Sequence, residues 1–287
     1  MSFHHGIRGK RLLECIKLKD AIRYGTTSKY ANESAERRST VDPEDVSHHS
    51  KLHEAWWKVT DEMIGLHALN RLRVPFVRDG LTNLGSGDAN NVLPLRGVTI
   101  ADIGCGGGIF TEALARIGAT VTGVDASPQL IETARNHAKL DRDIADRISY
   151  ECTTVEDFSL TRPQQFDAVV ASEILEHVKD KSLFLQSCVA AIKPGGSLFI
   201  TTPGRTIFSW VALIVVGEYI AHALPVGTHE WDKFISPDET RRILKSYGCD
   251  TVLVHGTLYN LLKNEWYWTT STAIHYVIHA VKKNRHE

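Results

Sequence analysis

The sequence predicts an α/β protein, with a mostly parallel sheet of seven strands and helices on both faces. Two observations support this fold class. Short apolar segments, each long enough for one buried strand, alternate with segments whose apolar residues recur at helical spacing. Some of the apolar segments are uninterrupted, as expected of strands that are covered on both faces of a parallel sheet. The alternation therefore indicates strands that are linked by helices packed on either side of the sheet.

The composition is that of an ordinary globular protein with one large or two small domains. It has 287 residues, of which 43% are apolar, and its net charge is −1. A charge so close to zero gives no overall indication of a nucleic-acid partner. The five cysteines are odd in number and no two lie close together. The sequence therefore predicts neither a disulfide framework nor a zinc site, and it favours a reducing compartment.

Residues 1–39 have the character of a leader. Residues 1–40 contain nine Lys and Arg but four Asp and Glu, whereas the rest of the chain contains 24 and 30. Basic and apolar residues alternate up to Arg23, and the hydroxyl-rich segment 24–28 follows. This pattern is typical of a mitochondrial targeting peptide, with a solvated basic helix of a cytosolic protein as the alternative. No apolar run reaches the roughly 18 residues of a membrane span.

Residues 40–92 are expected to form an N-terminal helical cap over a nucleotide cleft. Asp42-Pro43 suits the N-cap and the first turn of a helix. Apolar residues at helical spacing continue the pattern over the Trp56-Trp57 pair. The turn-rich segment 83–91 marks the boundary with a core domain that spans residues 93–287.

The core domain begins with a glycine-rich stretch. An apolar run over residues 98–101 is followed by Asp102 and by four glycines within residues 104–108. A helical pattern starts at Ile109, and a second apolar run ends on Asp125. Glycine permits a sharp turn and a close backbone approach to a ligand, and an acid at a strand tip can accept two hydrogen bonds from a ribose diol. Ligands of open α/β sheets bind at this carboxyl end of the strands.

The spacing of the glycines indicates which nucleotide binds. A dinucleotide site requires G-x-G-x-x-G, whereas this turn reads D-x-G-C-G-G-G. Asp102 stands where a pyrophosphate would lie and would repel it, but it suits a cationic amino-acid tail. Gly104 and Gly106 allow the close approach. The pattern resembles the first motif of class I S-adenosylmethionine-dependent methyltransferases, and a glycine-rich turn of another α/β protein is the alternative.

The rest of the chain continues the alternation of helices and strands. Further helices are predicted over residues 127–139, 182–192 and 237–247, and further strands over residues 148–155, 166–171, 197–201, 249–255 and 273–281. With the two strands of the glycine-rich stretch, these make the seven strands of the predicted sheet.

A second group of functional residues follows the predicted strand 166–171. On a helix, Glu173, Glu176 and His177 would stand at i, i+3 and i+4 and share one face. Two carboxylates and an imidazole there can hold a divalent cation, and oxygen-rich ligation suits Mg²⁺. The imidazole would equally suit Mn²⁺ or Zn²⁺. The alternative is an acid–histidine pair that works without a metal and orients the substrate or caps a turn.

An apolar insert is predicted over residues 205–230, between a strand and the next helix. Residues 207–216 are almost continuously apolar but too few to span a bilayer. The sheet already has its helices, so the insert near the mouth of the site is expected to contact a membrane surface over residues 207–224. A buried core helix is the alternative.

Motifs spread over about residues 40–282 resemble one family. They are Thr40–Pro43, Trp56-Trp57, Leu66-His67, Asn70, Arg73–Phe76, Asp102–Gly108, Ala171–His177, Lys193–Thr202, Gly227–His229, Trp231, Phe234 and Leu258–Asn260. Together they resemble the ubiquinone-biosynthesis O-methyltransferases, which act on polyprenyl dihydroxybenzoate and demethylubiquinol. The sequence departs from the family at Lys58, where an acid is usual, and at His48-His49, where an aromatic residue is usual.

The resemblance implies a Rossmann-like class I methyltransferase fold and a set of site residues. At matching motif positions the cofactor contacts are Arg73, Gly104, Asp125 and Ser172, and the magnesium ligands are Glu173, Glu176 and His177. The resemblance also implies a peripheral protein on the matrix side of the mitochondrial inner membrane. There it would work with other ubiquinone-biosynthesis proteins in a complex.

The expected reaction transfers the methyl group of S-adenosylmethionine to a ring hydroxyl of a polyprenylated catechol or quinol. Two adjacent ring oxygens would chelate the metal, which lowers the pKa of the attacking hydroxyl from the phenolic value of about 10. Glu173 and His177 are the expected catalytic residues, with His177 as a metal ligand or a general base. The alternatives are a metal-independent small-molecule methyltransferase and a scaffolding subunit of a membrane biosynthetic complex.

Overall fold

The computed structural model describes residues 39–58, 63–206 and 233–284. By internal contacts the chain divides into two units, Met1–Ser39 and Thr40–Glu287, and the second unit contains the sheet. Residues 1–38 of the predicted leader and residues 207–230 of the predicted insert lie outside the described residues. Among the described helices, none combines the length and the apolar character needed to cross a membrane.

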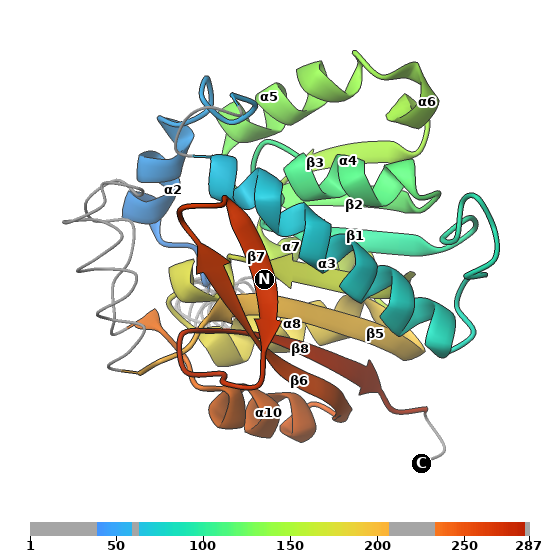
Figure 1. Ribbon diagram of the computed structural model, residues 1–287, viewed down its shortest axis with the longest axis vertical. Helices are drawn as coiled ribbons and strands as arrows, with labels where there is room; N and C mark the ends of the chain where they lie inside the picture. The colour runs from blue at the N-terminus through green and yellow to red at the C-terminus, as the bar shows by residue number, and fades with distance from the viewer. Residues whose placement is uncertain (1–38, 59–62, 207–232, 285–287) are drawn as a thin grey trace, which may run out of the picture. The chain divides into compact units, whose positions relative to one another are not determined.

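Eight strands form one sheet in the order β3-β2-β1-β4-β5-β8-β6-β7 (Figure 1). The first five strands of this order are parallel, whereas β8 is antiparallel to β5 and β6, and β7 is antiparallel to β6. The strands are β1 Thr99–Ile103, β2 Thr120–Asp125, β3 Ile148–Cys152, β4 Phe166–Ser172, β5 Ile192–Pro203, β6 Cys249–Asn260, β7 Glu265–Thr269 and β8 His275–Lys282. The predicted fold class is confirmed, with eight strands in place of the predicted seven.

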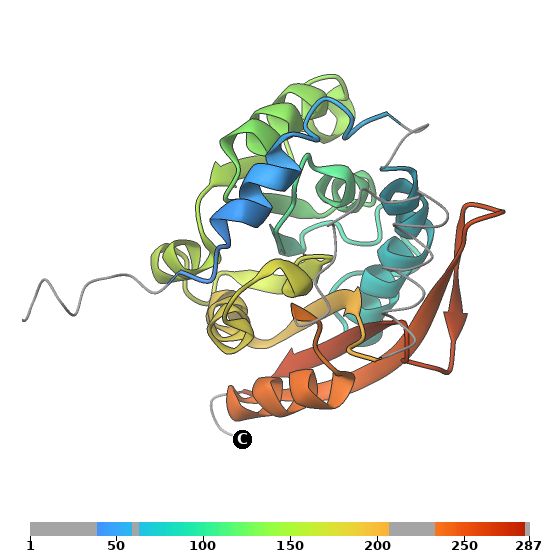
Figure 2. The same ribbon diagram turned by 90° about the vertical axis from the view of Figure 1, so that its left-hand side faces the viewer.

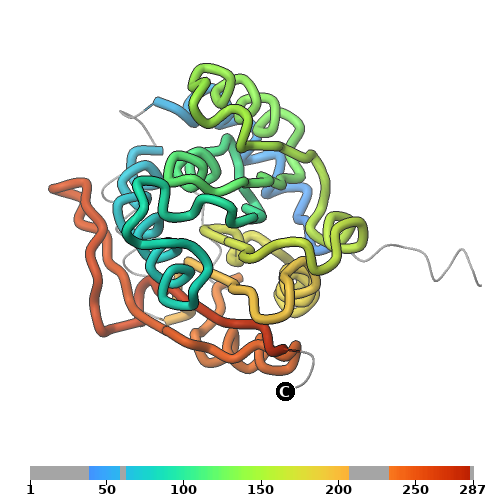
Figure 3. The backbone as a smooth tube through the Cα atoms, turned by 90° about the vertical axis from the view of Figure 1, so that its right-hand side faces the viewer, coloured from blue at the N-terminus to red at the C-terminus, as the bar shows by residue number. Residues whose placement is uncertain are grey.

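The additional strand, β7, lies at the edge of the sheet. β6 continues past the predicted end at residue 255 to Asn260 and pairs with β7 as a hairpin. Figure 2 and Figure 3 show this hairpin at one side of the fold. β7 pairs with a single strand and none of its residues is fully buried. It therefore lacks the apolar run by which a strand buried on both faces is predicted.

Helices cover both faces of the sheet (Figure 2). One core cluster joins the sheet to α3 Ile64–Asn83, α4 Ile109–Arg116 and α6 Arg142–Ala145, and another joins it to α7 Val155–Thr161, α8 Lys181–Ala191 and α10 Pro237–Ser246. α5 Pro128–Ala138 packs on β2 and β3. Within β1, Ile100 belongs to the first cluster, whereas Ala101 and Ile103 belong to the second. This alternation is what a strand buried on both faces requires.

Two helix starts that the sequence predicts are confirmed. Asp42 caps α2 (Pro43–Ser50) by accepting a hydrogen bond from the Glu44 backbone N–H at 3.2 Å. Ser127 caps α5 in the same way, with the Leu130 N–H as donor at 3.3 Å.

The predicted helical pattern over the tryptophan pair is wrong. α2 ends at Ser50, and residues 51–57 form turns. The Trp57 indole N–H donates to the Gly107 carbonyl at 2.9 Å, and its ring stacks on His137 with 3.3 Å between centroids. These contacts with the core domain determine the path of the cap segment, and helical spacing along the sequence contains no information about them.

Candidate active site

The glycine turn lies between β1 and α4, at the carboxyl end of the sheet. Gly104 and Gly106 have φ values of 73° and 54°, a region that side chains rarely adopt. A Cβ at Gly104 would lie 2.5 Å from Ile174, and a Cβ at Gly106 would lie 2.2 Å from the Trp56 ring. The turn therefore requires glycine for both its conformation and its contacts.

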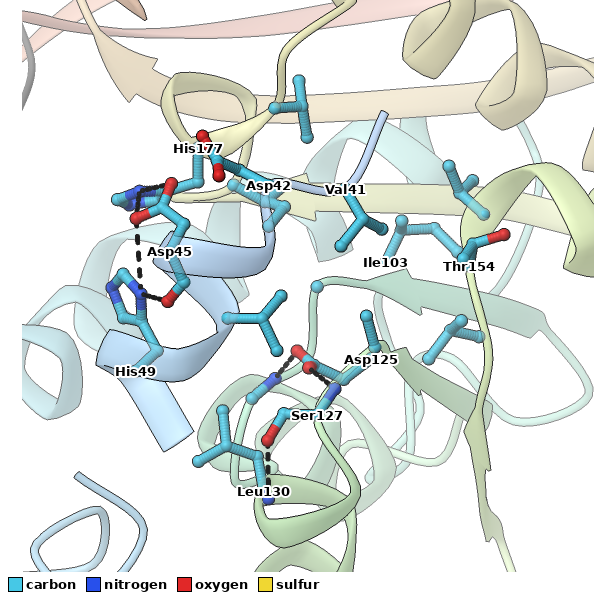
Figure 4. A pocket seen from close by; sticks show the side chains of 18 of the residues that line it. Val41, Asp42, Asp45, His49, Ile103, Asp125, Ser127, Leu130, Thr154 and His177 are labelled. Atoms are coloured by element: carbon cyan, nitrogen blue, oxygen red, sulfur yellow. Dashed lines mark hydrogen bonds and ion pairs between the residues drawn. The ribbon is translucent and has the colours of Figure 1, made fainter. Parts of the chain in front are cut away.

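A cavity of about 120 Å³ opens above this turn (Figure 4). Asp125, at the end of β2, accepts hydrogen bonds from the backbone N–H groups of Gly106 at 2.9 Å and Ser127 at 2.8 Å. Burial raises the pKa of its carboxyl group. The structure thus places Gly104, Gly106 and Asp125 together in one cavity wall, as the sequence predicts.

The cavity has the chemistry of a site for a cationic nucleoside. Four acids contribute to its lining, namely Asp42, Asp45, Asp125 and Glu173. The Trp56 ring also lines it, and the indole N–H is buried without a hydrogen-bond partner among the described residues. Such a donor can be satisfied by a ligand, and the acids suit a sulfonium and an ammonium group. These residues fit S-adenosylmethionine.

Asp102 lies beneath the glycine turn, and it is not among the described residues that line the cavity. It is 2% exposed and accepts a hydrogen bond from the Thr111 hydroxyl at 2.6 Å. Burial raises the pKa of this carboxyl to about 6, although Thr111 and Arg73 oppose the shift. Its contact with the cofactor's amino-acid tail stays a prediction.

Arg73, on α3, contacts Ser172 at the end of β4. It is not among the described residues that line the cavity. It donates to the Ser172 hydroxyl and the Asn70 side chain, both at 2.8 Å, and its guanidinium lies 4.2 Å from the Phe110 ring centroid. Burial lowers its pKa to about 10, so it keeps its charge at neutral pH. The predicted cofactor residues Arg73 and Ser172 are therefore bonded to each other behind the site.

The predicted helix that places Glu173, Glu176 and His177 on one face is wrong. Glu173 has a φ of 56° and lies outside any helix, and only residues Leu175–His177 form a short 3₁₀ turn. Glu173 accepts hydrogen bonds from the Thr201 hydroxyl at 2.6 Å and the His275 Nε2–H at 2.8 Å. Burial alone would raise the pKa of Glu173, but His275, Thr201 and Arg73 lower it to about 2.

Glu176 is a buried carboxylate in an unfavourable environment. It is 3% exposed and accepts a hydrogen bond from the Thr202 hydroxyl at 2.8 Å. Burial and the negative charge of Glu173 raise its pKa well above the usual range. A cation near the two carboxylates would offset this repulsion. The predicted ligands Glu173, Glu176 and His177 do not, however, form a group whose ligand atoms all lie within 4.8 Å of one another among the described residues.

His177 lies between two acids. Its Nδ1 is 3.2 Å from Asp45 Oδ2, and its Nε2 is 3.9 Å from Glu176 Oε1. Among the described residues, one set of three potential metal-binding side chains has its ligand atoms within 4.8 Å of one another: Asp45, His49 and His177. The structure thus adds α2 of the cap to the site.

Comparison with known proteins identifies the family. Residues 101–200 match a family described as "Methyltransferase domain". The mitochondrial ubiquinone biosynthesis O-methyltransferase of Rattus norvegicus is 42% identical over 248 residues, which cover 86% of this chain and 72% of that protein. The protein of the same name from Homo sapiens is 39% identical over 278 residues, which cover 97% of this chain and 74% of that protein. The chain belongs to the ubiquinone biosynthesis O-methyltransferases.

A bacterial relative agrees with this assignment, and a solved structure has a similar fold. The ubiquinone biosynthesis O-methyltransferase of Nitrobacter winogradskyi is 38% identical over 86% of this chain and 93% of its own length. The magnesium protoporphyrin IX methyltransferase of Synechocystis, solved with bound S-adenosylmethionine, has a TM-score of 0.54 and 16% identity over 86% of this chain and all of its own. The latter shows the fold alone. The predicted family and S-adenosylmethionine-dependent methyltransferase fold are confirmed.

Several residues of this methyltransferase site escape prediction from sequence. Asp45 of the cap contacts His177, and His275 of β8 contacts Glu173. In both pairs the two residues are far apart in the sequence. Trp56 covers the glycine turn, although its position in a tryptophan pair is visible in the sequence. The spacing of Asp45 and His49, four residues apart on α2, is the one local signal that could have drawn attention to the cap.

Proposed function

We propose that this O-methyltransferase transfers a methyl group from S-adenosylmethionine to a ring hydroxyl of polyprenyl dihydroxybenzoate and demethylubiquinol. The observation that carries the proposal is the position of Glu173 and His177 in the lining of the same cavity as the glycine turn and Asp125. The acceptor and the methyl donor would therefore meet at the carboxyl end of the sheet, where ligands of such folds bind.

The described residues divide the binding of the methyl donor between them. Gly104 and Gly106 let the backbone approach the ligand, and Asp125 offers carboxylate oxygens for the ribose hydroxyls. Trp56 encloses the cavity over the turn and offers its indole N–H. S-adenosylmethionine, when bound, supplies a methyl group on a positively charged sulfur. The acids of the cavity favour that charge.

A magnesium ion held by Glu173, Glu176 and His177 is part of the proposal. The raised pKa of Glu176, caused by burial and by Glu173, supports a cation in this position. A bound magnesium ion would supply positive charge that lowers the pKa of a neighbouring ring hydroxyl. The buried Thr201 and Thr202 hydroxyls hold the two carboxylates in place.

The cellular setting is also proposed. The relatives from Rattus norvegicus and Homo sapiens are mitochondrial. With the basic leader of residues 1–39, this supports a mitochondrial protein on the matrix side of the inner membrane. Residues 207–224 would contact the membrane surface, and other ubiquinone-biosynthesis proteins would be its partners. The substrate tail favours this arrangement, because a polyprenyl chain resides in the bilayer.

The test is methyl transfer from labelled S-adenosylmethionine to short-tailed demethylubiquinol and dihydroxybenzoate. EDTA should abolish the activity and added Mg²⁺ should restore it. Glu176→Gln should lower the activity by at least the roughly 10–100-fold that loss of an outer-shell partner causes, whereas Glu132→Gln, on the exposed side of α5, should leave it unchanged. Cofactor binding without transfer to either acceptor would refute the substrate assignment.

A metal-independent reaction is the second candidate. The observation that favours it is the Asp45–His177 pair, because a carboxylate that holds a histidine is the arrangement of a general base. Activity that persists in EDTA and is lost in His177→Gln would establish this second mechanism.

A further inference from the structure

His177 is held by a residue from a distant part of the chain. Its Nδ1 lies 3.2 Å and 3.3 Å from the two carboxylate oxygens of Asp45, which belongs to helix α2 of the cap (Figure 4). The opposite nitrogen, Nε2, lies 3.9 Å from Glu176 Oε1. The ring therefore has one nitrogen toward Asp45 of the cap and the other on the side of Glu176, a proposed metal ligand.

An ionised carboxylate only accepts hydrogen bonds, so the ring nitrogen that faces it must carry a proton. In a neutral ring the lone pair is then on the other nitrogen. We propose that Asp45 is a positioning residue, which fixes His177 as the Nδ1–H tautomer and keeps the lone pair on Nε2, whose distance of 3.9 Å from Glu176 Oε1 is too long for a hydrogen bond. The proposal rests on the proposed function for the role of His177, either as a metal ligand or as a base.

Neighbouring contacts fix Asp45 itself. Lys233 Nζ lies 2.9 Å from the Asp42 carboxylate and 3.8 Å from that of Asp45. His49 Nδ1 donates to the Asp45 backbone carbonyl at 3.0 Å. These contacts hold the carboxylate in front of the His177 ring.

His49 also restrains the ring that Asp45 orients. The rings of His49 and His177 meet edge to face, with 4.7 Å between centroids and 72° between planes. Rotation of the His177 ring would therefore break the Asp45 contact and disturb the packing against His49. A histidine held in this way is the usual arrangement of a metal ligand or base whose second nitrogen bonds to a carboxylate.

The arrangement links the cap to the chemistry. Val46 and His49 of α2 line the same cavity as Asp125 and His177. The helix that closes one side of the cofactor cavity is thus the helix that orients His177. The Asp45–His177 contact therefore joins the cap to the proposed tautomer of His177.

The tautomer can be measured directly by ¹⁵N NMR of histidine-labelled protein, with the His177 signals assigned from His177→Gln. The wild-type protein should show a protonated Nδ1. Asp45→Ala should shift the ring to a mixture of tautomers or to Nε2–H. Asp45→Asn keeps the shape and loses the charge, so it separates the electrostatic contact from packing. Glu44→Ala, exposed on the same helix, is the matched control and should leave the signals unchanged.

A second readout uses Mn²⁺ as a spectroscopic substitute for Mg²⁺. Electron paramagnetic resonance should show that Asp45→Ala binds Mn²⁺ about 10–100-fold more weakly than the wild type, the usual effect of removing an outer-shell carboxylate. The kcat should fall by a larger factor than the KM for S-adenosylmethionine rises, because Asp45 is one of four acids in the cavity lining but acts on the reaction through His177. Glu44→Ala should behave as the wild type in both measurements.

Two outcomes would overturn the proposal. One is a wild-type ring protonated on Nε2, or an Nδ1–H tautomer that survives in Asp45→Ala. The other is tight Co²⁺ binding by the wild type that is lost in both His49→Ala and Asp45→Ala, which would make these side chains direct metal ligands. If the wild type binds no Mn²⁺, the proposed magnesium site fails, and the NMR measurement still decides the role of Asp45.

Discussion

Asp102 is a buried carboxylate whose negative charge is unfavourable in the folded protein. Its pKa is raised to about 6 by burial, compared with an ordinary value of 3.8. The folded state therefore binds more protons than the unfolded state between about pH 4 and pH 6. The free energy of unfolding should fall as the pH rises through this window. A shift of about two pH units corresponds to about 3 kcal/mol.

Asp102→Asn removes this titration and keeps an acceptor for the Thr111 hydroxyl. The stability of the variant relative to the wild type should increase by up to about 3 kcal/mol between pH 4 and pH 8. Urea unfolding across this range measures the difference and cancels the other titrating groups. A difference that is independent of pH would contradict a folded-state pKa of about 6 for Asp102.

Single residues differ in how far the sequence predicts them. Asp125 and Gly104 were predictable because a strand, a turn and an acid follow one another within a short stretch. His275 was not, because it reaches Glu173 across 102 positions of the chain. Glu173 itself was predicted as a site residue, but its left-handed backbone was not, since helical spacing gives no indication of such a break.

At the scale of elements, the glycine turn and the cap segment fit against each other. An alanine at position 106 would have to adopt the left-handed backbone of Gly106, with a φ of 54°. Its Cβ would also lie 2.2 Å from the Trp56 ring. Gly97 is a matched control, because its φ is 87° and nothing lies within 4 Å of its Cβ position. The two alanine variants therefore share the backbone penalty, which is about 1–2 kcal/mol, and differ in the clash.

Gly106→Ala should destabilise the protein by about 1–3 kcal/mol more than Gly97→Ala does. It should also weaken S-adenosylmethionine binding, which Gly97→Ala should leave unchanged. Thermal unfolding and equilibrium dialysis measure the two effects. Trp56→Ala in the Gly106→Ala background should recover part of the lost stability. Equal destabilisation by Gly106→Ala and Gly97→Ala would instead show that the Trp56 ring moves aside without an energetic cost.

The same elements show why the cap was harder to predict than the core domain. α5 is amphipathic and has a serine cap, so the local sequence predicts the residue at which it begins. Residues 51–57 also have apolar residues at helical spacing, yet the Trp57 indole donates to the Gly107 carbonyl and stacks on His137. Contacts between distant segments outweigh a local preference of a few tenths of a kcal/mol per residue.

At the scale of the whole molecule, most of the parallel part of the sheet was predictable, because β1, β2, β4 and β5 have continuous runs of buried residues. The antiparallel side was less so, since β7 is an exposed edge strand. This side nevertheless contributes to the site. A continuous series of side-chain hydrogen bonds links α3, the parallel strands, β8 and β6. Its distances are 2.6–2.8 Å, and its members are, in order, Arg73, Ser172, Thr201, Glu173, His275 and Thr257.

This series of hydrogen bonds predicts energetic coupling between β6 and the proposed metal site. Thr257 is fully buried, and its hydroxyl lies 2.6 Å from His275 Nδ1. Thr257→Val would leave that buried nitrogen without a partner, which costs about 1–3 kcal/mol. Since His275 Nε2–H donates to Glu173, the effects of Thr257→Val and Glu173→Gln should be non-additive by about 0.5–3 kcal/mol in a double-mutant cycle.

Thr240 provides the control for this cycle. It is as fully buried as Thr257, but its hydroxyl lies 2.9 Å from Tyr276 Oη, which is not part of the series of hydrogen bonds that leads to Glu173. Thr240→Val and Glu173→Gln should therefore add to within about 0.5 kcal/mol. If urea unfolding showed the Thr257 pair to be equally additive, the hydrogen bonds would be local, and the antiparallel strands would support Glu173 by packing alone.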